Sequence, residues 1–300
     1  MVLSKEKVIT EIVLSGGGTN ALALIGALHT LHTERKTATV TRWVGASAGA
    51  LIALFMVLGY APQSVYRLLL NIDYEQLNEA NCDSVLSFYD TMGVIDGYNI
   101  MNIMRLAMRK KGYDVQTNFI DLQNTSHCDL VVAVYNLTTG KTVSFSAQTT
   151  PHVPVLTACR MSISVPFLFR PVQYKGDMYI DGCTIEHVPV RFSKHKDKAI
   201  IIQCVTSTQD SNRAPIPHDV PSFFSLLHGR IGTIMHKKCL RKVMKKRPHT
   251  ILNIVLPCTG TTTFVVDFGM NTQHKKNLFL LGTESAHTYI NTVWKKSLSN

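Results

Sequence analysis

The sequence predicts an α/β protein with a mostly parallel central sheet. Twice in the first 60 residues, an apolar strand runs into a glycine-rich turn and then into an apolar helix. The first unit joins a strand at Val8–Leu14 to a helix that starts at Ala21, and the second joins Val40–Val44 to Ala50–Leu58. Repeated strand–turn–helix units are typical of parallel sheets. With 45% hydrophobic and 17% charged residues, the 300-residue chain also has the composition of a globular protein.

The remaining elements follow from hydrophobic periodicity and from turn residues. Further strands are predicted at Leu130–Tyr135, Thr142–Ser146, Val172–Tyr174, Met178–Ile180, Ala199–Val205 and Ile251–Leu256. Further helices are predicted at Asn99–Lys111, Val153–Met161, Pro221–Lys246 and Leu278–Lys295. The proline-containing segment Ser207–Pro221 is interpreted as a long loop within one fold. We therefore expect a single domain over residues 1–300.

Cysteine usage and hydropathy indicate a reduced, intracellular environment. The seven cysteines are scattered and form no C-x-x-C pair, which argues against a disulfide framework and a structural zinc site. The most apolar stretch, Trp43–Leu58, is shorter than the roughly 20 residues that span a bilayer. No signal peptide is recognisable at the N-terminus. We expect a cytoplasmic protein that associates peripherally with membranes.

The second glycine-rich turn, Gly45-Ala-Ser47-Ala-Gly49, matches the pattern G-x-S-x-G between a strand and a helix. In this arrangement small flanking residues permit a sharp turn that projects a serine hydroxyl at a helix N-terminus. The helix dipole there favours a developing oxyanion. The pattern is short, and a tight structural turn would also need glycines. The strand before and the apolar helix after favour a nucleophilic Ser47.

The first turn, Gly16-Gly17-Gly18, has two possible functions. Its backbone N–H groups suit either a phosphate cradle or an oxyanion hole. Gly16-x-Gly18-x-x-Ala21 even fits the loose dinucleotide pattern, but the following strand ends without the acidic residue that binds ribose. No P-loop sequence occurs. A nucleotide site is therefore disfavoured.

Asp181 is the candidate general base for Ser47. It ends a predicted strand and precedes Gly182, so its side chain can point into a cleft. An Asp-Gly pair is also a common turn, which is the plainer interpretation. Serine esterases need a base, yet an α/β-hydrolase places several strands before its nucleophile. Here one strand–helix unit precedes Ser47.

The order of these motifs resembles the patatin-like phospholipase family, whose Ser–Asp dyad works without a catalytic histidine. The resemblance runs from Ile12 to Cys204 and includes Ser162-Ile-Ser-Val-Pro-Phe-Leu-Phe-Arg-Pro171, which is similar to the family's run before its Asp-Gly. It implies a three-layer α/β/α fold, with a catalytic core over residues 8–206. Residues 207–300 would then extend the same fold, largely as helix with one added strand.

The resemblance also assigns roles to individual residues. It implies that Ser47 is the nucleophile and Asp181 the base. Gly17 and Gly18 match the oxyanion-hole donors, with the N–H of Ala48 as a further donor by the geometry of the turn. The remaining motif positions are Gly45 and Gly49, which flank the nucleophile, and Gly182, which follows the base. Two positions differ from the family pattern, because Asn20-Ala21 replaces a cation followed by glycine, and Cys183 follows Asp181-Gly182.

The implied function is a phospholipase A-type lipid acyl hydrolase that releases fatty acids from glycerophospholipids. The chemistry needs no metal and no cofactor. A transacylase, a lysophospholipase or a neutral-lipid esterase on the same fold stays open, since the missing cation beside Gly18 weakens the case for phosphate recognition. An alternative of another class is a catalytically silent, basic lipid- or nucleic-acid-binding protein. No nucleic-acid-binding motif supports the latter, so no nucleic acid is expected as a partner.

The net charge of +11 is concentrated in one segment. Residues 230–247 carry eight Lys and Arg and no acid, with apolar residues at helical spacing between them. A basic amphipathic helix of this kind binds anionic bilayers. The plainer interpretation is that its apolar stripe packs on the sheet and its charges are solvated. The candidate membrane contacts are Lys237, Lys238, Arg241, Lys242, Lys245 and Lys246.

Overall fold

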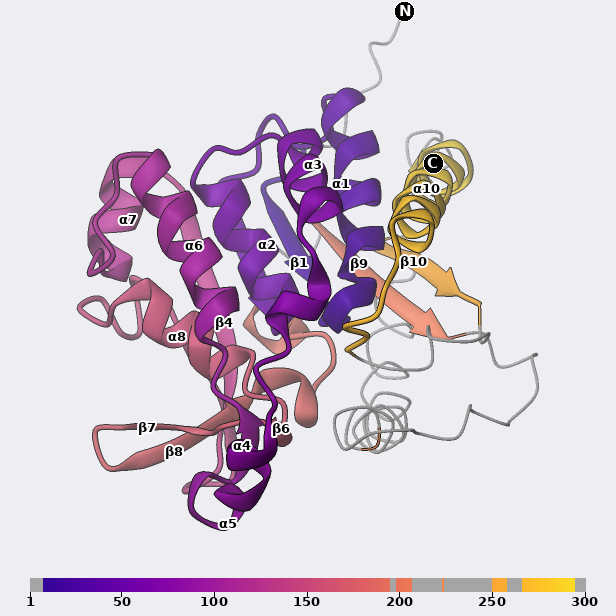
Figure 1. Ribbon diagram of the computed structural model, residues 1–300. Helices are drawn as coiled ribbons and strands as arrows, with labels where there is room; N and C mark the ends of the chain where they lie inside the picture. Colours follow the sequence, from indigo (N-terminus) through magenta and orange to yellow (C-terminus); the bar gives the residue numbers. More distant parts are fainter. Residues whose placement is uncertain (1–7, 195–197, 207–222, 224–249, 258–265, 295–300) are drawn as a thin grey trace, which may run out of the picture.

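A computed structural model describes residues 8–194, 198–206, 223, 250–257 and 266–294 (Figure 1). In these residues the strands form an eight-stranded sheet in the order β10-β9-β1-β2-β4-β8-β7, with β5 paired to β4 beside this path. The parallel strands are β1 (Glu11–Leu14), β2 (Arg42–Ala46), β4 (Asp129–Asn136), β9 (Ala199–Thr206) and β10 (Ile251–Leu256). The antiparallel additions are β5 (Lys141–Phe145), β7 (Val172–Tyr174) and β8 (Asp177–Asp181). The expected α/β fold with a mostly parallel sheet is confirmed.

Most of the described helices contribute residues to one core, on one face of this sheet. The described helices are α1 (Leu22–Thr33), α2 (Ala48–Val57), α3 (Pro62–Asn71), α4 (Cys82–Leu86), α5 (Phe88–Thr91), α6 (Tyr98–Lys110), α7 (Phe119–Ser126), α8 (Val155–Ser162) and α10 (Thr272–Tyr289). A two-stranded sheet of β3 (Gly93–Ile95) and β6 (Phe167–Phe169) lies beside α4 and α5 (Figure 1). None of the described helices is both long and apolar enough to cross a membrane.

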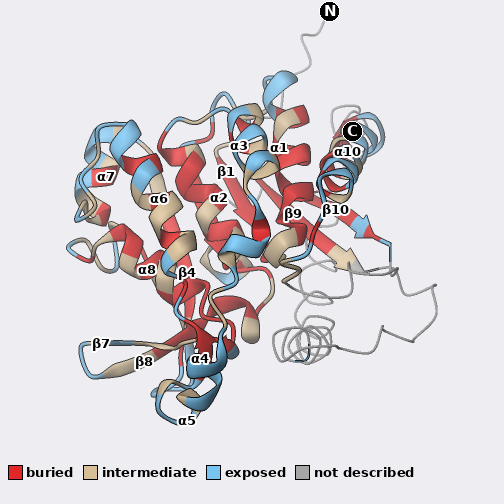
Figure 2. Ribbon diagram, viewed as in Figure 1, coloured by how far each residue is buried: buried red, intermediate tan, exposed pale blue. Residues whose placement is uncertain are grey.

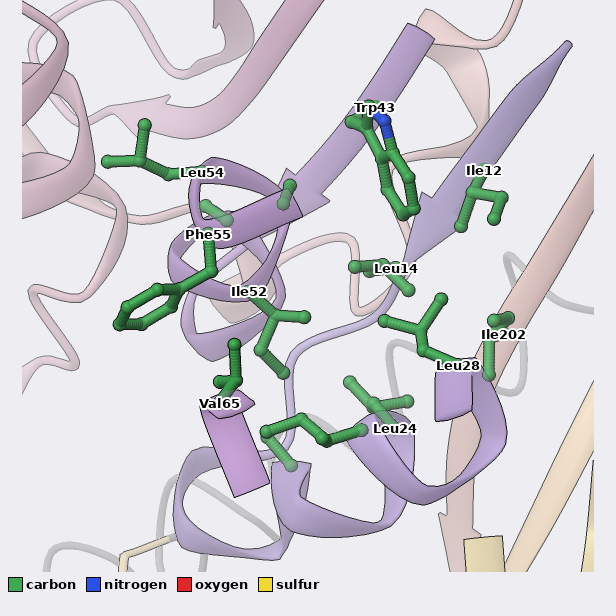
Figure 3. Packing of buried hydrophobic residues seen from close by; sticks show 14 of the residues in the cluster. Ile12, Leu14, Leu24, Leu28, Trp43, Ile52, Leu54, Phe55, Val65 and Ile202 are labelled. Carbon is green, nitrogen blue, oxygen red and sulfur yellow. The ribbon is translucent and has the colours of Figure 1, made fainter. Parts of the chain in front are cut away.

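The main core lies between the sheet and the helices on one of its faces. Ile12 and Leu14 of β1 point to this face and pack with Leu24 and Leu28 of α1 (Figure 3). Val13, between them, points to the other face, as the period-2 geometry of a strand requires. Figure 2 shows the central strands β1 and β4 almost wholly buried. They need apolar residues on both faces, which is why β1 and β4 have nearly continuous hydrophobic sequences.

Helices α1 and α10 cross at unusually close range. A Cβ atom on Gly282 would collide with the carbonyl of Ala23, and one on Gly26 would collide with the carbonyl of Phe279. Glycine therefore permits the two backbones to meet. This contact fixes the described C-terminal segment, 266–294, against the first helix of the chain.

Most predicted elements are present, with shifted ends. Helix α10 starts at Thr272, before the predicted Leu278, because the Asn271 side chain caps it by accepting from the N–H of His274 at 2.8 Å. The helices α3, α4, α5 and α7 and the short strands β3 and β6 were not predicted. The predicted helix Pro221–Lys246, with the six candidate membrane cations, lies outside the described residues apart from Phe223, and the domain boundary at residue 206 stays a prediction.

Candidate active site

Ser47 occupies a strained turn between β2 and α2. Its backbone has φ 55° and ψ −133°, and a positive φ is uncommon for a residue with a side chain. The residue is 5% exposed. Strand β2 ends at Ala46 and α2 begins at Ala48, so the turn consists of this one residue. This is the geometry expected for a nucleophile elbow.

The two glycines of the G-x-S-x-G pattern are required by close packing. A Cβ on Gly45 would collide with the carbonyl of Gly49, and a Cβ on Gly49 would collide with the carbonyl of Ser15 in the loop after β1. The elbow and the Gly16–Gly18 loop therefore press against each other. Side chains at either glycine would push them apart.

Ser162, the last residue of α8, holds the elbow in place. Its Oγ accepts the backbone N–H of Ser47 at 2.9 Å and donates to the carbonyl of Ala133 in β4 at 2.7 Å. Ser162 is fully buried. In the sequence it belongs to the run that resembles the family, but no role was predicted for it.

Asp181 is the last residue of β8 and is fully buried. Its Oδ1 accepts the backbone N–H of Cys183 at 2.7 Å, and its own N–H donates to the carbonyl of Ser164 at 2.9 Å. Burial raises the pKa of the Asp181 carboxyl to about 7, against the smaller lowering effects of the Ser47 hydroxyl and of Cys183. The carboxyl is thus held near the pKa of a useful base at neutral pH.

Ser47 and Asp181 come together from β2 and β8, which lie on either side of β4. The Ser47 hydroxyl favours the ionised form of the Asp181 carboxyl and so lowers its pKa. The contact is looser than a full hydrogen bond, since no donor in the described part of the chain reaches Asp181 Oδ2 at hydrogen-bond geometry. Nucleophile–base contacts of this kind often tighten only when substrate binds.

The Gly16–Gly18 loop and the start of α2 present backbone N–H groups beside Ser47. Gly16 is not available as a donor, because its N–H donates to the carbonyl of His187 at 3.1 Å. Gly18 begins a 3-10 turn with φ 52°, and Ala48 is the first residue of α2. The N–H groups at helix starts lack partners within the helix. Gly18 and Ala48 line the same cavity as Ser47, whereas Gly17 is not one of its lining residues.

An apolar cavity opens beside Ser47. Its volume is about 140 Å³. One water molecule needs roughly 10–15 Å³, so the cavity is large enough for a group of many atoms. Among the described residues that line it, none is Lys, Arg, His, Asp or Glu. Much of the wall comes from three helices, through Leu51, Ile52 and Phe55 of α2, Leu69 of α3, and Ile103 and Met104 of α6. A fatty acyl chain is the kind of group that such a wall accepts.

The C-terminal segment completes the wall, which the sequence did not predict. Val266 and Phe268 line the cavity, and the N–H of Asp267 donates to Thr19 Oγ1 of the glycine loop at 3.0 Å. The residues of this segment carry no motif. Their position depends on the α1–α10 contact, which single-sequence periodicity does not reveal.

His187 and the aromatic residues have mostly structural positions. The half-buried His187 ring contacts the carbonyl of Cys204 at 3.2 Å, and loss of solvent lowers the pKa of the imidazole. His187 therefore has a packing position, although it is the histidine closest in sequence to Asp181. Among neighbouring aromatic residues, Phe169 lines the cavity, whereas Phe88, Tyr89, Tyr98 and Phe167 do not.

Arg160 connects the segment before Asp181 to the neighbouring segments. Its guanidinium donates to the carbonyl of Asp96 at 2.7 Å, to Ser164 Oγ at 2.6 Å and to the carbonyl of Arg170 at 2.9 Å. Because the Ser164 carbonyl accepts the N–H of Asp181, Arg160 is linked to Asp181 through Ser164. No sequence signal other than its place before Ser162 pointed to it.

A strained serine at an elbow, a buried aspartate and a glycine loop around an apolar cavity agree with one protein family. The sequence profile described as patatin-like phospholipase matches residues 12–192. The chain belongs to this family. The matched range includes the Gly16–Gly18 loop, Ser47 and Asp181.

Relatives of the chain agree with this membership. A protein of invertebrate iridescent virus 6 named "Probable lipid hydrolase 463L" is 29% identical over 212 residues, which cover 68% of this chain and 71% of that protein. The uncharacterised protein YqhO of Bacillus subtilis is 28% identical over 296 residues, covering 93% and 97% of the two chains. The patatin-like chain is therefore a member of a lipid hydrolase family.

Solved structures show the same fold. VipD of Legionella pneumophila superposes with a TM-score of 0.64 at 14% identity, covering 95% of this chain and 67% of VipD. ExoU of Pseudomonas aeruginosa, in its complex with SpcU, superposes with a TM-score of 0.56 at 16% identity. This chain spans 53% of the ExoU chain. At these identities the likeness concerns the fold.

Proposed function

We propose that the protein is a serine esterase that uses Ser47 and Asp181 as a dyad to release fatty acids from glycerophospholipids. The observation that carries the proposal is a serine on a strained elbow beside a buried carboxylate, at the wall of an apolar cavity. Asp181, with a pKa raised to about 7, is able to accept a proton at neutral pH.

In the first half of the reaction, Asp181 takes the proton of Ser47 Oγ as this oxygen attacks the ester carbonyl carbon. The N–H groups of Gly18 and Ala48, with Gly17 as the further candidate, stabilise the oxyanion of the tetrahedral intermediate. The intermediate expels the glycerol-side oxygen, which takes the proton from Asp181. The acyl group stays on Ser47 as an ester.

In the second half, water replaces the leaving alcohol. Asp181 takes a proton from that water as it attacks the acyl-enzyme, and the same oxyanion hole serves again. Ser47 recovers its proton from Asp181 when the fatty acid leaves. Protons balance over the cycle, and no metal or cofactor takes part in these steps.

The test is lipid product analysis with purified wild-type, Ser47→Ala and Asp181→Ala proteins. Each variant should lose the release of fatty acid from phosphatidylcholine, and the double variant should be scarcely worse, because the two residues act as a unit. Circular dichroism should show that the variants remain folded. Release of fatty acid by folded Ser47→Ala protein at the wild-type rate would refute the proposal.

A second candidate on the same site is a neutral-lipid esterase or a transacylase. The observation that favours it is the lack of a cation among the described cavity-lining residues, together with Asn20 and Ala21 after the glycine loop. Product analysis separates the cases. A neutral-lipid esterase would prefer diacylglycerol to phosphatidylcholine, and a transacylase would return acyl groups to an added alcohol acceptor.

A further inference from the structure

A group of exposed apolar side chains lies on the short helices α4 and α5. Leu86 is 81% exposed and Tyr89 is 94% exposed, and Val85 and Met92 are exposed as well. We call these four residues the α4–α5 patch. Figure 2 shows α5 as largely solvent-exposed, and Figure 1 places α4, α5 and β6 together at one end of the molecule.

The patch is continuous with the substrate cavity through a small hydrophobic cluster. The Phe88 side chain, beside Tyr89 in sequence, packs on the cluster formed by Val94, Ile95, Val165, Leu168 and Phe169. Val165 and Phe169 also line the cavity beside Ser47. An apolar path therefore leads from the exposed patch to the cavity wall.

The segment that carries the patch is held firmly at its base. The Glu79 carboxylate accepts the N–H of Gly97 at 3.0 Å and of Asn99 at 2.6 Å, which ties the two ends of the segment together. Asn81 and Ser84 form a capping box at the start of α4. The exposed tips of Leu86 and Tyr89 are thus presented by an ordered scaffold, and replacing them should leave the fold intact.

The charge of the segment that carries the patch is opposite to that of the whole protein. Residues 68–104 contain no Lys or Arg but six acids, which are Asp73, Glu75, Glu79, Asp83, Asp90 and Asp96. Asp83 precedes the patch residues and Asp90 lies between Tyr89 and Met92, and both are exposed. Carboxylates are repelled by the negative potential of an anionic bilayer, so this surface suits lipid without net charge.

We propose that the α4–α5 patch is the surface by which the enzyme inserts into a zwitterionic phospholipid layer. The proposal rests on the proposed function, since it supplies the route by which an acyl chain reaches Ser47. Apolar side chains that enter the layer remove the water between lipid and cavity, and the acyl chain then stays in apolar surroundings throughout. The acidic residues around the patch disfavour anionic headgroups at the same place.

The test measures vesicle binding in the Ser47→Ala protein, so that lipid is not consumed. Leu86→Ser/Tyr89→Ser should weaken co-sedimentation with phosphatidylcholine vesicles by roughly tenfold for each side chain removed. The effect should be the same at low and high salt, because the interaction is apolar. The matched control is Val8→Ser/Leu280→Ser, which removes two exposed apolar side chains before β1 and on α10 and should leave binding unchanged.

Two further measurements separate a role in lipid contact from a role in catalysis. With Ser47 intact, Leu86→Ser/Tyr89→Ser should hydrolyse a short soluble ester normally but phosphatidylcholine vesicles more slowly. Asp83→Asn/Asp90→Asn should raise binding to vesicles that contain phosphatidylserine, without changing binding to phosphatidylcholine alone.

The proposal is overturned if Leu86→Ser/Tyr89→Ser binds phosphatidylcholine vesicles as wild type does, or if the control loses binding equally. It is also overturned if the patch variant only abolishes self-association in analytical ultracentrifugation, because the occupant would then be a second copy. A failure of the proposed function is distinguishable, since it would appear as wild-type protein without Ser47-dependent hydrolysis of any lipid.

Discussion

Burial determines what Asp181 is able to do. A carboxyl in water has a pKa near 4 and is a weak base. Here burial raises the pKa to about 7, even though the Cys183 N–H and the Ser47 hydroxyl favour the charged form. Basicity increases while the group stays ionised in a useful fraction of molecules at neutral pH.

We therefore predict a rising pH profile for hydrolysis of a short soluble ester. Asp181 must be ionised to act as base, so kcat/KM should increase about tenfold per pH unit below pH 7 and level off above it. Initial rates between pH 5 and pH 9, corrected for alkaline hydrolysis, check this. A profile that is flat from pH 5 to pH 8 would contradict the role of Asp181.

At the residue scale, sequence reasoning selected Ser47 and Asp181 as candidates because motif order carries information that single motifs lack. Ser162 and Arg160 had no assigned role, since their functions depend on hydrogen bonds to Ala133, Ser47 and Asp96 across the fold. Contacts between distant segments leave no local pattern.

At the scale of elements, Arg160 of α8 joins the loop before α6 to the segment before β8. Its three donations hold the backbone carbonyls of Asp96 and Arg170 and the side-chain hydroxyl of Ser164. Since Ser164 accepts the N–H of Asp181, a shift of this segment moves the base.

We predict that Arg160→Met lowers kcat for a short ester by up to roughly 100-fold with little change in KM. Arg160→Lys should restore part of the rate, because a lysine replaces one of the three donors. The apparent pKa of the rate profile should shift in Arg160→Met, which a loss of folded protein alone would not cause. The exposed Arg109→Met on α6 is the control and should behave as wild type.

Elements were predictable where periodicity was long and strong. The central strands and α1, α2 and α6 have such patterns. The strands β3 and β6 have three residues each, too few for a period. The helix α4 has five residues and depends on its capping box, so neither length nor hydrophobic pattern identifies it.

At the scale of the whole molecule, the cavity depends on contact between the two ends of the chain. Val266 and Phe268 line it, and α10 rests on α1 where Gly282 meets Ala23. Gly→Ala inside a helix ordinarily stabilises by roughly 1 kcal/mol. At Gly282 the added methyl group would instead force the helices apart.

Gly282→Ala should therefore lower the free energy of unfolding, by about 1–3 kcal/mol. Hydrolysis of long-chain esters should fall as well, because the cavity wall moves. Urea denaturation measures the first effect. Gly269→Ala, whose Cβ would meet only Asp267 at an ordinary 3.6 Å, is the matched control. Equal stability of Gly282→Ala and wild type would show that the helices adjust freely.

Membrane binding through the basic segment, residues 230–247, remains a prediction about the whole molecule. Replacing Lys237, Lys238, Arg241, Lys242, Lys245 and Lys246 with Gln should weaken binding to anionic vesicles and leave hydrolysis of a short soluble ester unchanged. Each Lys or Arg near an anionic surface contributes about 1 kcal/mol. Co-sedimentation of the variant with anionic vesicles across a salt series tests this prediction. Unchanged, salt-insensitive binding would show that these residues are not the contact.

The burial of Asp181 also opposes folding. The folded chain holds a proton on this carboxyl up to about pH 7, whereas the unfolded chain releases it near pH 4. The native state binds more protons over that interval, so stability falls as pH rises through it. Asp181→Asn, which has no charge to bury, should be free of this loss. Its stability advantage over wild type should grow by about 2–3 kcal/mol between pH 5 and pH 8. Asp181, the proposed base, would thus lower the stability of the folded protein at neutral pH.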